Sequence, residues 1–121
     1  MNIAIVLPCY NEEAVIEESN NILVNMLCSL LDKQIIDDAA LIYVDDGSCD
    51  KTWECIKRLA FANKFSVQIH GVKLAHNSGH QNALIAGISR VYEEGYDAVV
   101  TIDVDLQDDV NCIEQMVQLA K

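Results

Sequence analysis

The sequence predicts an α/β fold with a doubly wound, mainly parallel sheet and helices on both faces of that sheet. Short apolar runs rich in β-branched residues alternate with amphipathic stretches along all 121 residues. The apolar runs lack the polar alternation of half-exposed strands, which is typical of parallel sheets buried on both sides. Right-handed crossover connections then favour the strand order 3-2-1-4, with the third strand at an edge.

Local patterns place the elements in order. Pro8 closes the first apolar run, and a stripe of apolar residues at helical spacing follows it. Asp50 is a candidate N-cap for the second helix, which carries Trp53 on its inward face as a core residue. The third strand changes phase at Gly71, which suggests a bulge, and Gly95 is a helix stop. The expected strands are 3–7, 40–44, 67–74 and 98–102, and the expected helices are 12–31, 50–63, 80–94 and 109 to the end.

Charge and cysteine content narrow the function classes. Nineteen acids against eight bases give a net charge of −11, which argues against a nucleic-acid partner and against docking on anionic membrane surfaces. The five cysteines show no metal-binding spacing and indicate free thiols in a reducing compartment. The first residues lack the features of a signal peptide, and no apolar run approaches the length of a membrane span. A cytoplasmic location is therefore expected.

Polar clusters follow the first, second and fourth strands, at residues 8–13, 45–48 and 103–109. Because the carboxyl ends of parallel strands meet at one edge of a sheet, these clusters are expected to share one crevice at the switch point of the strand order. An acidic chain that binds an anionic ligand there needs a local source of positive charge, such as a metal ion or a helix N-terminus.

Asp103 and Asp105 leave the fourth strand on the same side, because they are two residues apart. Two neighbouring carboxylates repel unless a cation or a proton lies between them, and Mg²⁺ or Mn²⁺ prefers such oxygen ligands. Gln107 is a candidate source of a further oxygen. The alternative is a solvated loop in which Asp108 or Asp109 caps the next helix.

The other clusters offer contacts to a nucleotide. A carboxylate of Asp45 or Asp46 is placed to accept from a base N–H, or else to close the strand in an Asx turn. Tyr10 is a candidate stacking platform, and Asn11 and Glu12 are candidate helix caps or ligand contacts.

The loop at residues 77–81 opens a helix whose free N–H groups are suited to a phosphate or a sugar hydroxyl. Lys73 and His76 add positive charge nearby. The alternative is simple capping of the helix by Asn77 or Ser78.

These clusters together resemble the family 2 glycosyltransferases with the GT-A fold. The resemblance rests on residues 7–13, 44–52, 77–84 and 103–107, and the Asp-x-Asp-Leu-Gln sequence is most similar to the polyprenyl-phosphate, dolichol-phosphate-mannose-synthase-like branch. It implies a nucleoside-diphosphate sugar donor, UDP- or GDP-linked, a lipid-phosphate acceptor, and an inverting displacement assisted by Mg²⁺ or Mn²⁺. The residues that it assigns to the nucleotide sugar are Pro8, Tyr10, Asn11, Glu12, Asp45, Asp46, Asn77, Gly79, His80, Asp103, Val104 and Asp105, and those that it assigns to the metal are Asp103, Asp105 and Gln107.

Members of this family continue well past 121 residues, so residues 1–121 are expected to be a donor-binding half. The catalytic residues of the acceptor side are expected beyond Lys121, in a parent protein that is a candidate for membrane association on the cytoplasmic face. The fragment alone is expected to bind donor weakly, not to turn over, and to self-associate through its bared fourth strand. The alternatives are a non-catalytic nucleotide-binding module and a phosphorelay receiver domain. The second requires an Asp after the third strand, which this chain lacks.

Overall fold

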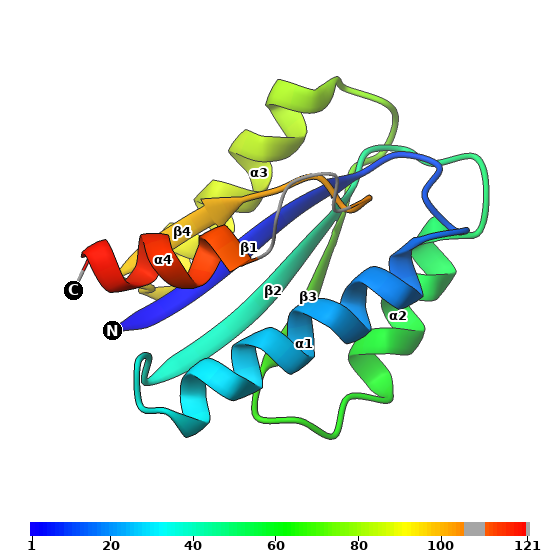
Figure 1. Ribbon diagram of the computed structural model, residues 1–121. Coiled ribbons are helices and arrows are strands. Elements are labelled where there is room, and N and C mark those ends of the chain that lie inside the picture. Colours follow the sequence, from blue (N-terminus) through cyan, green and yellow to red (C-terminus); the bar gives the residue numbers. More distant parts are fainter. Residues whose placement is uncertain (106–110, 121) are drawn as a thin grey trace.

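A parallel sheet organises the computed structural model, which describes residues 1–105 and 111–120. Within these residues the strand order is β3-β2-β1-β4, so the predicted order 3-2-1-4 is confirmed. The elements are β1 (Asn2–Cys9), α1 (Ile16–Asp32), β2 (Asp38–Asp45), α2 (Thr52–Phe61), β3 (Gln68–Lys73), α3 (His80–Glu94), β4 (Ala98–Thr101) and α4 (Asn111–Ala120) (Figure 1).

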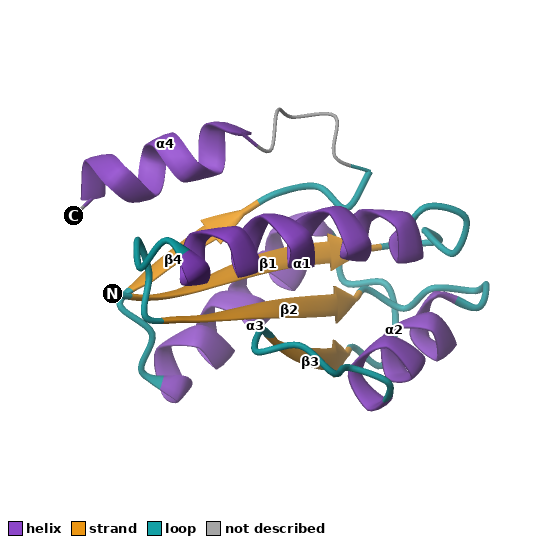
Figure 2. Ribbon diagram, turned by 60° about the horizontal axis from the view of Figure 1, so that its bottom comes forward, coloured by secondary structure: helices purple, strands orange, loops and turns teal. Residues whose placement is uncertain are grey.

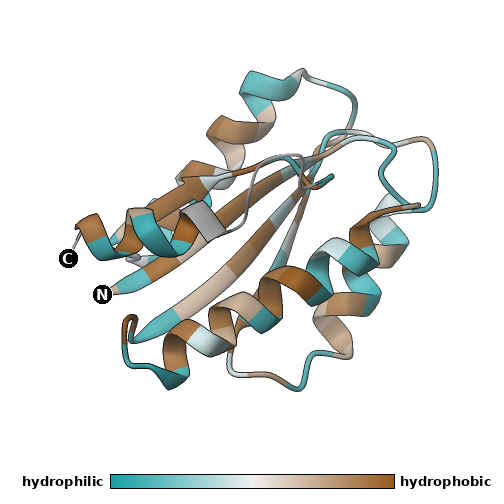
Figure 3. Ribbon diagram, in the orientation of Figure 1, coloured by the Kyte–Doolittle hydropathy of each residue, from teal (hydrophilic) through white to brown (hydrophobic). Residues whose placement is uncertain are grey.

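Alternate residues of β1 face two different helical layers. Ile5 and Leu7 pack into a core with α1, α2 and α4, and Val6 packs into a second core with α3. Figure 2 shows α1 and α3 on opposite sides of the sheet, and Figure 3 shows the hydrophobic character of the strands between them. The central strands are buried on both faces, which explains why their sequences lack polar alternation. The predicted helices on both faces are confirmed.

Two sequence-based details are wrong, and neighbouring elements explain both. β1 continues through Pro8 to Cys9, because β4 pairs only with residues 3–6 of β1 and Pro8 therefore needs no N–H on that side. β3 pairs with β2 in unbroken register through Gly71, so it has no bulge there. A Cβ on Gly71 would lie 2.8 Å from Ile56 Cγ2 and 3.0 Å from the Trp53 ring, so the glycine makes room for α2.

The helix ends agree with the predictions in part. Gly95 ends α3 in the left-handed conformation, as predicted. The N-cap of α2 is Lys51 and not Asp50, although the Asp50 carboxylate accepts from the Thr52 N–H at 2.9 Å. Burial raises the pKa of Asp50, but hydrogen bonds from Thr52 outweigh it and hold that pKa below its ordinary value. α1 begins four residues later than predicted, at Ile16, and the predicted start of the last helix at residue 109 lies outside the described residues.

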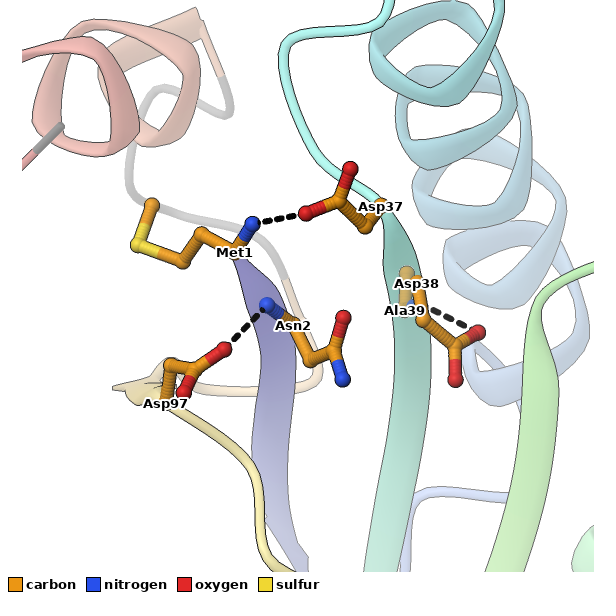
Figure 4. Close-up of polar contacts among 6 residues, drawn as sticks. All are labelled: Met1, Asn2, Asp37, Asp38, Ala39 and Asp97. Atoms are coloured by element: carbon orange, nitrogen blue, oxygen red, sulfur yellow. Dashed lines mark hydrogen bonds and ion pairs between the residues drawn. The ribbon is translucent and has the colours of Figure 1, made fainter.

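Acidic side chains join the amino ends of three strands, at the edge of the sheet away from the polar clusters (Figure 4). The Met1 ammonium group pairs with Asp37, which precedes β2. The Asn2 N–H donates to Asp97 Oδ2 at 2.7 Å, and Asp97 precedes β4. Some of the acidic side chains of the chain therefore stabilise the fold and are not part of the polar clusters.

Cys9, Cys28, Cys49 and Cys55 are free thiols, as expected. Burial raises the pKa of the Cys9 thiol, and the charges of Glu12 and Asp45 raise it further. Among the described helices, none combines the length and the apolar composition that crossing a bilayer requires.

Candidate functional site

A cleft of about 380 Å³ opens at the carboxyl ends of β1, β2 and β4. In Figure 1 these ends lie on the side opposite the two termini. The structure therefore brings the clusters that follow these strands together with the loop before α3, at the position expected for the ligand of a doubly wound sheet. The lining consists of Pro8, Cys9, Tyr10, Glu12, Asp46, Asn77, Gly79, His80, Asp103, Val104 and Asp105.

Asp46 is the structural centre of this cleft. Its side chain is buried, its Oδ1 accepts from the Ser78 N–H at 2.7 Å, and its Oδ2 accepts from the Gly79 N–H at 3.2 Å. Its own N–H donates to the Cys9 carbonyl oxygen at 2.8 Å. One residue thus joins the end of β1, the end of β2 and the loop that enters α3.

Gly47 allows this loop to approach the end of β2. Its φ is +69°, and a Cβ added there would lie 2.3 Å from the Asn77 nitrogen and 2.4 Å from the His76 carbonyl carbon. A side chain at position 47 would therefore meet backbone atoms that cannot swing aside. Within the loop, the Asn77 side chain accepts from the Gly79 N–H at 3.1 Å. The loop is therefore stabilised by its own side chain as well as by Asp46.

The loop after β1 is held by the segment that leads into α2. The Asn11 N–H donates to Ser48 Oγ at 2.9 Å, and Asn11 Oδ1 accepts from the Cys49 N–H at 2.8 Å. The Glu12 N–H donates to Thr52 Oγ1 at 2.8 Å. Asn11 does not line the cleft, and its side chain fixes the loop.

Asp45 also lies outside the lining of the cleft. It is 1% exposed, and its Oδ1 accepts from the Ser48 N–H at 3.1 Å, which is the strand-closing turn that the sequence left open as an alternative. Its Oδ2 has no hydrogen-bond partner among the described residues. Asp46, and not Asp45, therefore faces the cleft.

Carboxylates gather on the opposite wall of the cleft. Partial burial raises the pKa of Glu12, and the charges of Asp105 and Asp103 raise it further, so these three acids share one electrostatic environment. Within residues 1–105 and 111–120, no group of three or more His, Cys, Asp or Glu side chains is placed to hold a metal ion. Asp103 and Asp105 are the described residues suited to a hard cation that takes few protein ligands, whereas Gln107 lies outside the described residues.

Sequence reasoning omitted Cys9 from this site, although it lies in the lining. The available signal was the position of Cys9 between Pro8 and Tyr10, both of which were candidate ligand contacts. The Gly79 N–H was expected to face a ligand but is occupied by Asp46 and Asn77. The free N–H groups of α3 are therefore those of its first turn, which begins at His80.

A doubly wound α/β domain with a cleft at the switch point of its strand order is the class that this sheet and cleft define. The chain belongs to the family described as Glycosyl transferase family 2, whose model matches residues 4–121. It is 41% identical over 112 residues to the uncharacterized glycosyltransferase YkoT of Bacillus subtilis (strain 168), a match that covers 92% of this chain and 32% of YkoT. It is 33% identical over 119 residues to the undecaprenyl-phosphate 4-deoxy-4-formamido-L-arabinose transferase of Photorhabdus laumondii, a match that covers 98% of this chain and 34% of that protein.

A solved structure shares the fold. The crystal structure of S. aureus TarS 1-349 in complex with UDP aligns with a TM-score of 0.61 at 22% sequence identity, over 87% of this chain and 28% of that chain. The chain spans about a third of the length of the curated relatives that it matches.

Proposed function

We propose that this chain forms the donor site of a glycosyltransferase that moves a sugar from a nucleoside-diphosphate sugar to a polyprenyl phosphate. The observation that carries this proposal is the cleft itself, in which the loop held by Asp46 lies opposite Asp103 and Asp105. Membership of the family supports the transfer chemistry. The name of the relative in Photorhabdus laumondii supports a lipid-phosphate acceptor, and the UDP bound to TarS supports a nucleotide donor.

The lining residues divide the work of donor binding. Tyr10 is 43% exposed at the mouth of the cleft and offers a ring face on which a base can stack. Asp46 keeps the loop of Asn77 in place beside the nucleoside. Asp103 and Asp105 would hold Mg²⁺ or Mn²⁺, which when bound neutralises the charge of the diphosphate.

The reaction is an inverting displacement at the anomeric carbon of the sugar. A phosphate oxygen of the acceptor forms the new bond to that carbon from the face opposite the diphosphate. The bond between the carbon and the diphosphate oxygen breaks, and the diphosphate leaves with the electron pair. The acceptor oxygen is already anionic, so no proton has to be removed from it.

Calorimetric titration tests the donor site. UDP and GDP are titrated into the chain with and without Mn²⁺, and the titrations are repeated with Asp105→Ala. Glu93→Ala is the matched control, because Glu93 is exposed and lies at the far end of α3. We expect one nucleotide to bind only with Mn²⁺ and this binding to be lost in Asp105→Ala and kept in Glu93→Ala. Nucleotide binding that is unchanged without Mn²⁺ and in Asp105→Ala would contradict the proposed metal site. The absence of nucleotide binding by a chain shown to be folded would contradict the proposed donor site.

A further inference from the structure

Acids and bases are segregated along this chain. Residues 55–92 contain no Asp or Glu but five of the eight bases, namely Lys57, Arg58, Lys64, Lys73 and Arg90. This segment therefore carries a charge of +5, and the rest of the chain carries −16. It comprises most of α2, all of β3 and most of α3. α2 packs against β3 at the edge of the sheet, whereas α3 packs mainly against β1 and β2.

An apolar groove lies at this edge, between α2 and β3. It has a volume of about 420 Å³ and is lined by Trp53, Ile56, Lys57, Ala60, Phe61 and Gly71. Phe61 is 95% exposed, which is unusual for an aromatic side chain at the end of a helix. Gly71 also lies in the lining, and the side chains of Ile56 and Trp53 occupy the space that its Cβ would need.

Cations border this groove. Lys57 lies in its lining, and Lys73 Nζ is 5.8 Å from the centroid of the Trp53 ring. Lys64 is exposed in the connection from α2 to β3. Arg58 adds less positive charge to this edge, because it forms an ion pair with Glu17 at 3.2 Å. Glu54, in the first turn of α2, is an acid on the same helix.

We propose that the edge formed by α2 and β3 docks on an anionic lipid surface. Phe61 enters the interface between headgroups and acyl chains, and Lys57, Lys64 and Lys73 lie against the lipid phosphates. An exposed aromatic ring beside lysines is the pattern of interfacial membrane contacts, because long lysine stems cover apolar surface while their charges reach the headgroups.

The net charge of −11 does not prevent this contact. Charges separated by more than about 8 Å are largely screened at physiological salt, so a membrane senses the local edge and not the sum over the chain.

One end of the groove, at Trp53 near the start of α2, lies towards the edge of the sheet that bears the cleft, and Phe61 lies at the other end of α2. Lys73 is the last residue of β3 and therefore stands at the same carboxyl edge of the sheet that bears the cleft. The docking itself rests on charge and exposure and does not require the proposed reaction.

Vesicle binding tests the proposal, with Trp53 as the probe, since it is the one tryptophan of the chain. The chain is mixed with vesicles of phosphatidylcholine alone or of phosphatidylcholine with phosphatidylglycerol, at low and at high salt. We expect a blue shift of the tryptophan emission and co-sedimentation with the anionic vesicles only, both lost at high salt. Each lysine near the surface is expected to strengthen binding about fivefold.

Matched variants locate the surface. Lys57→Glu with Lys64→Glu leaves the contact of Lys73 with Trp53 intact and is expected to weaken vesicle binding by more than tenfold. Phe61→Ser is expected to weaken binding to the anionic vesicles at low salt. Lys33→Glu, an exposed lysine at the end of α1, is the control and should bind as the parent chain does.

Several outcomes would overturn the proposal. They are no binding to anionic vesicles at low salt, equal binding to phosphatidylcholine, or equal losses in Lys33→Glu and in the Lys57 and Lys64 variant. A change of tryptophan emission with protein concentration alone would indicate that a second copy covers the groove instead. Asp105→Ala should keep vesicle binding, and the Lys57 and Lys64 variant should keep nucleotide binding, so failure here and failure of the donor site are separable.

Discussion

Replacing Gly47 by alanine should destabilise the protein far more than a left-handed glycine alone would explain. The new Cβ would cost about 1 kcal/mol because φ is +69°. It would also displace the backbone of His76 and Asn77, since it would lie 2.3 Å from the Asn77 nitrogen. That displacement weakens the hydrogen bonds of Ser78 and Gly79 to the charged Asp46, at about 1.5–3 kcal/mol for one such bond. The expected total is about 2.5–4 kcal/mol if one of these hydrogen bonds is lost.

Urea denaturation followed by circular dichroism measures this loss. Gly95→Ala is the matched control, because Gly95 has a φ of +80° and no described atom lies within 4 Å of its hypothetical Cβ. We expect Gly95→Ala to lose only about 1 kcal/mol. The reasoning is refuted if Gly47→Ala loses no more than Gly95→Ala, because the close approach of the loop would then carry no energetic weight.

Three further predictions concern the same region. Asp46→Asn should lower the free energy of unfolding by about 1–3 kcal/mol and speed amide exchange in the loop before α3, because an amide nitrogen cannot accept; unchanged exchange would contradict this. With iodoacetamide at pH 8, mass spectrometry should find Cys49 modified and Cys9 protected, since Cys9 is buried and its pKa is raised; equal labelling in the folded chain would be the contrary result. Asp50→Ala should cost at most about 1 kcal/mol at neutral pH, because its carboxylate is largely solvated. The pKa of Asp50 is lower in the folded state than in the unfolded state. The stability difference between the parent chain and Asp50→Ala should therefore be present above the unfolded pKa of about 3.9 and vanish as the pH falls through the folded pKa. A stability difference that persists in acid would contradict this prediction.

Local patterns in the sequence determined the elements and their order. The range of α3 and its stop at Gly95 were predicted to the residue, because helical periodicity and a left-handed stop are properties of neighbouring positions. The strand order followed from burial on both faces and from the handedness of crossovers. The grouping of polar residues at one edge followed from the same topology.

Contacts between distant segments were not visible in these patterns. The sequence left open which of Asp45 and Asp46 offers its carboxylate to the crevice. In the structure Asp46 lines the cleft and bonds to residues 32 and 33 positions away. The prediction of a bulge at Gly71 was wrong. The glycine is needed because α2 packs closely against it, and the periodicity of a strand contains no information about a neighbouring helix.

The sequence by itself determined the fold class, the family resemblance and the net charge of −11. Only the tertiary structure decided which acids face the cleft and which serve the fold, as Asp97 does at the amino end of β1. It also decided that Lys57 and Lys73 lie beside one apolar groove. The physical reason is that periodicity reports which side of its own element a residue faces, whereas a site depends on which elements the fold brings beside it.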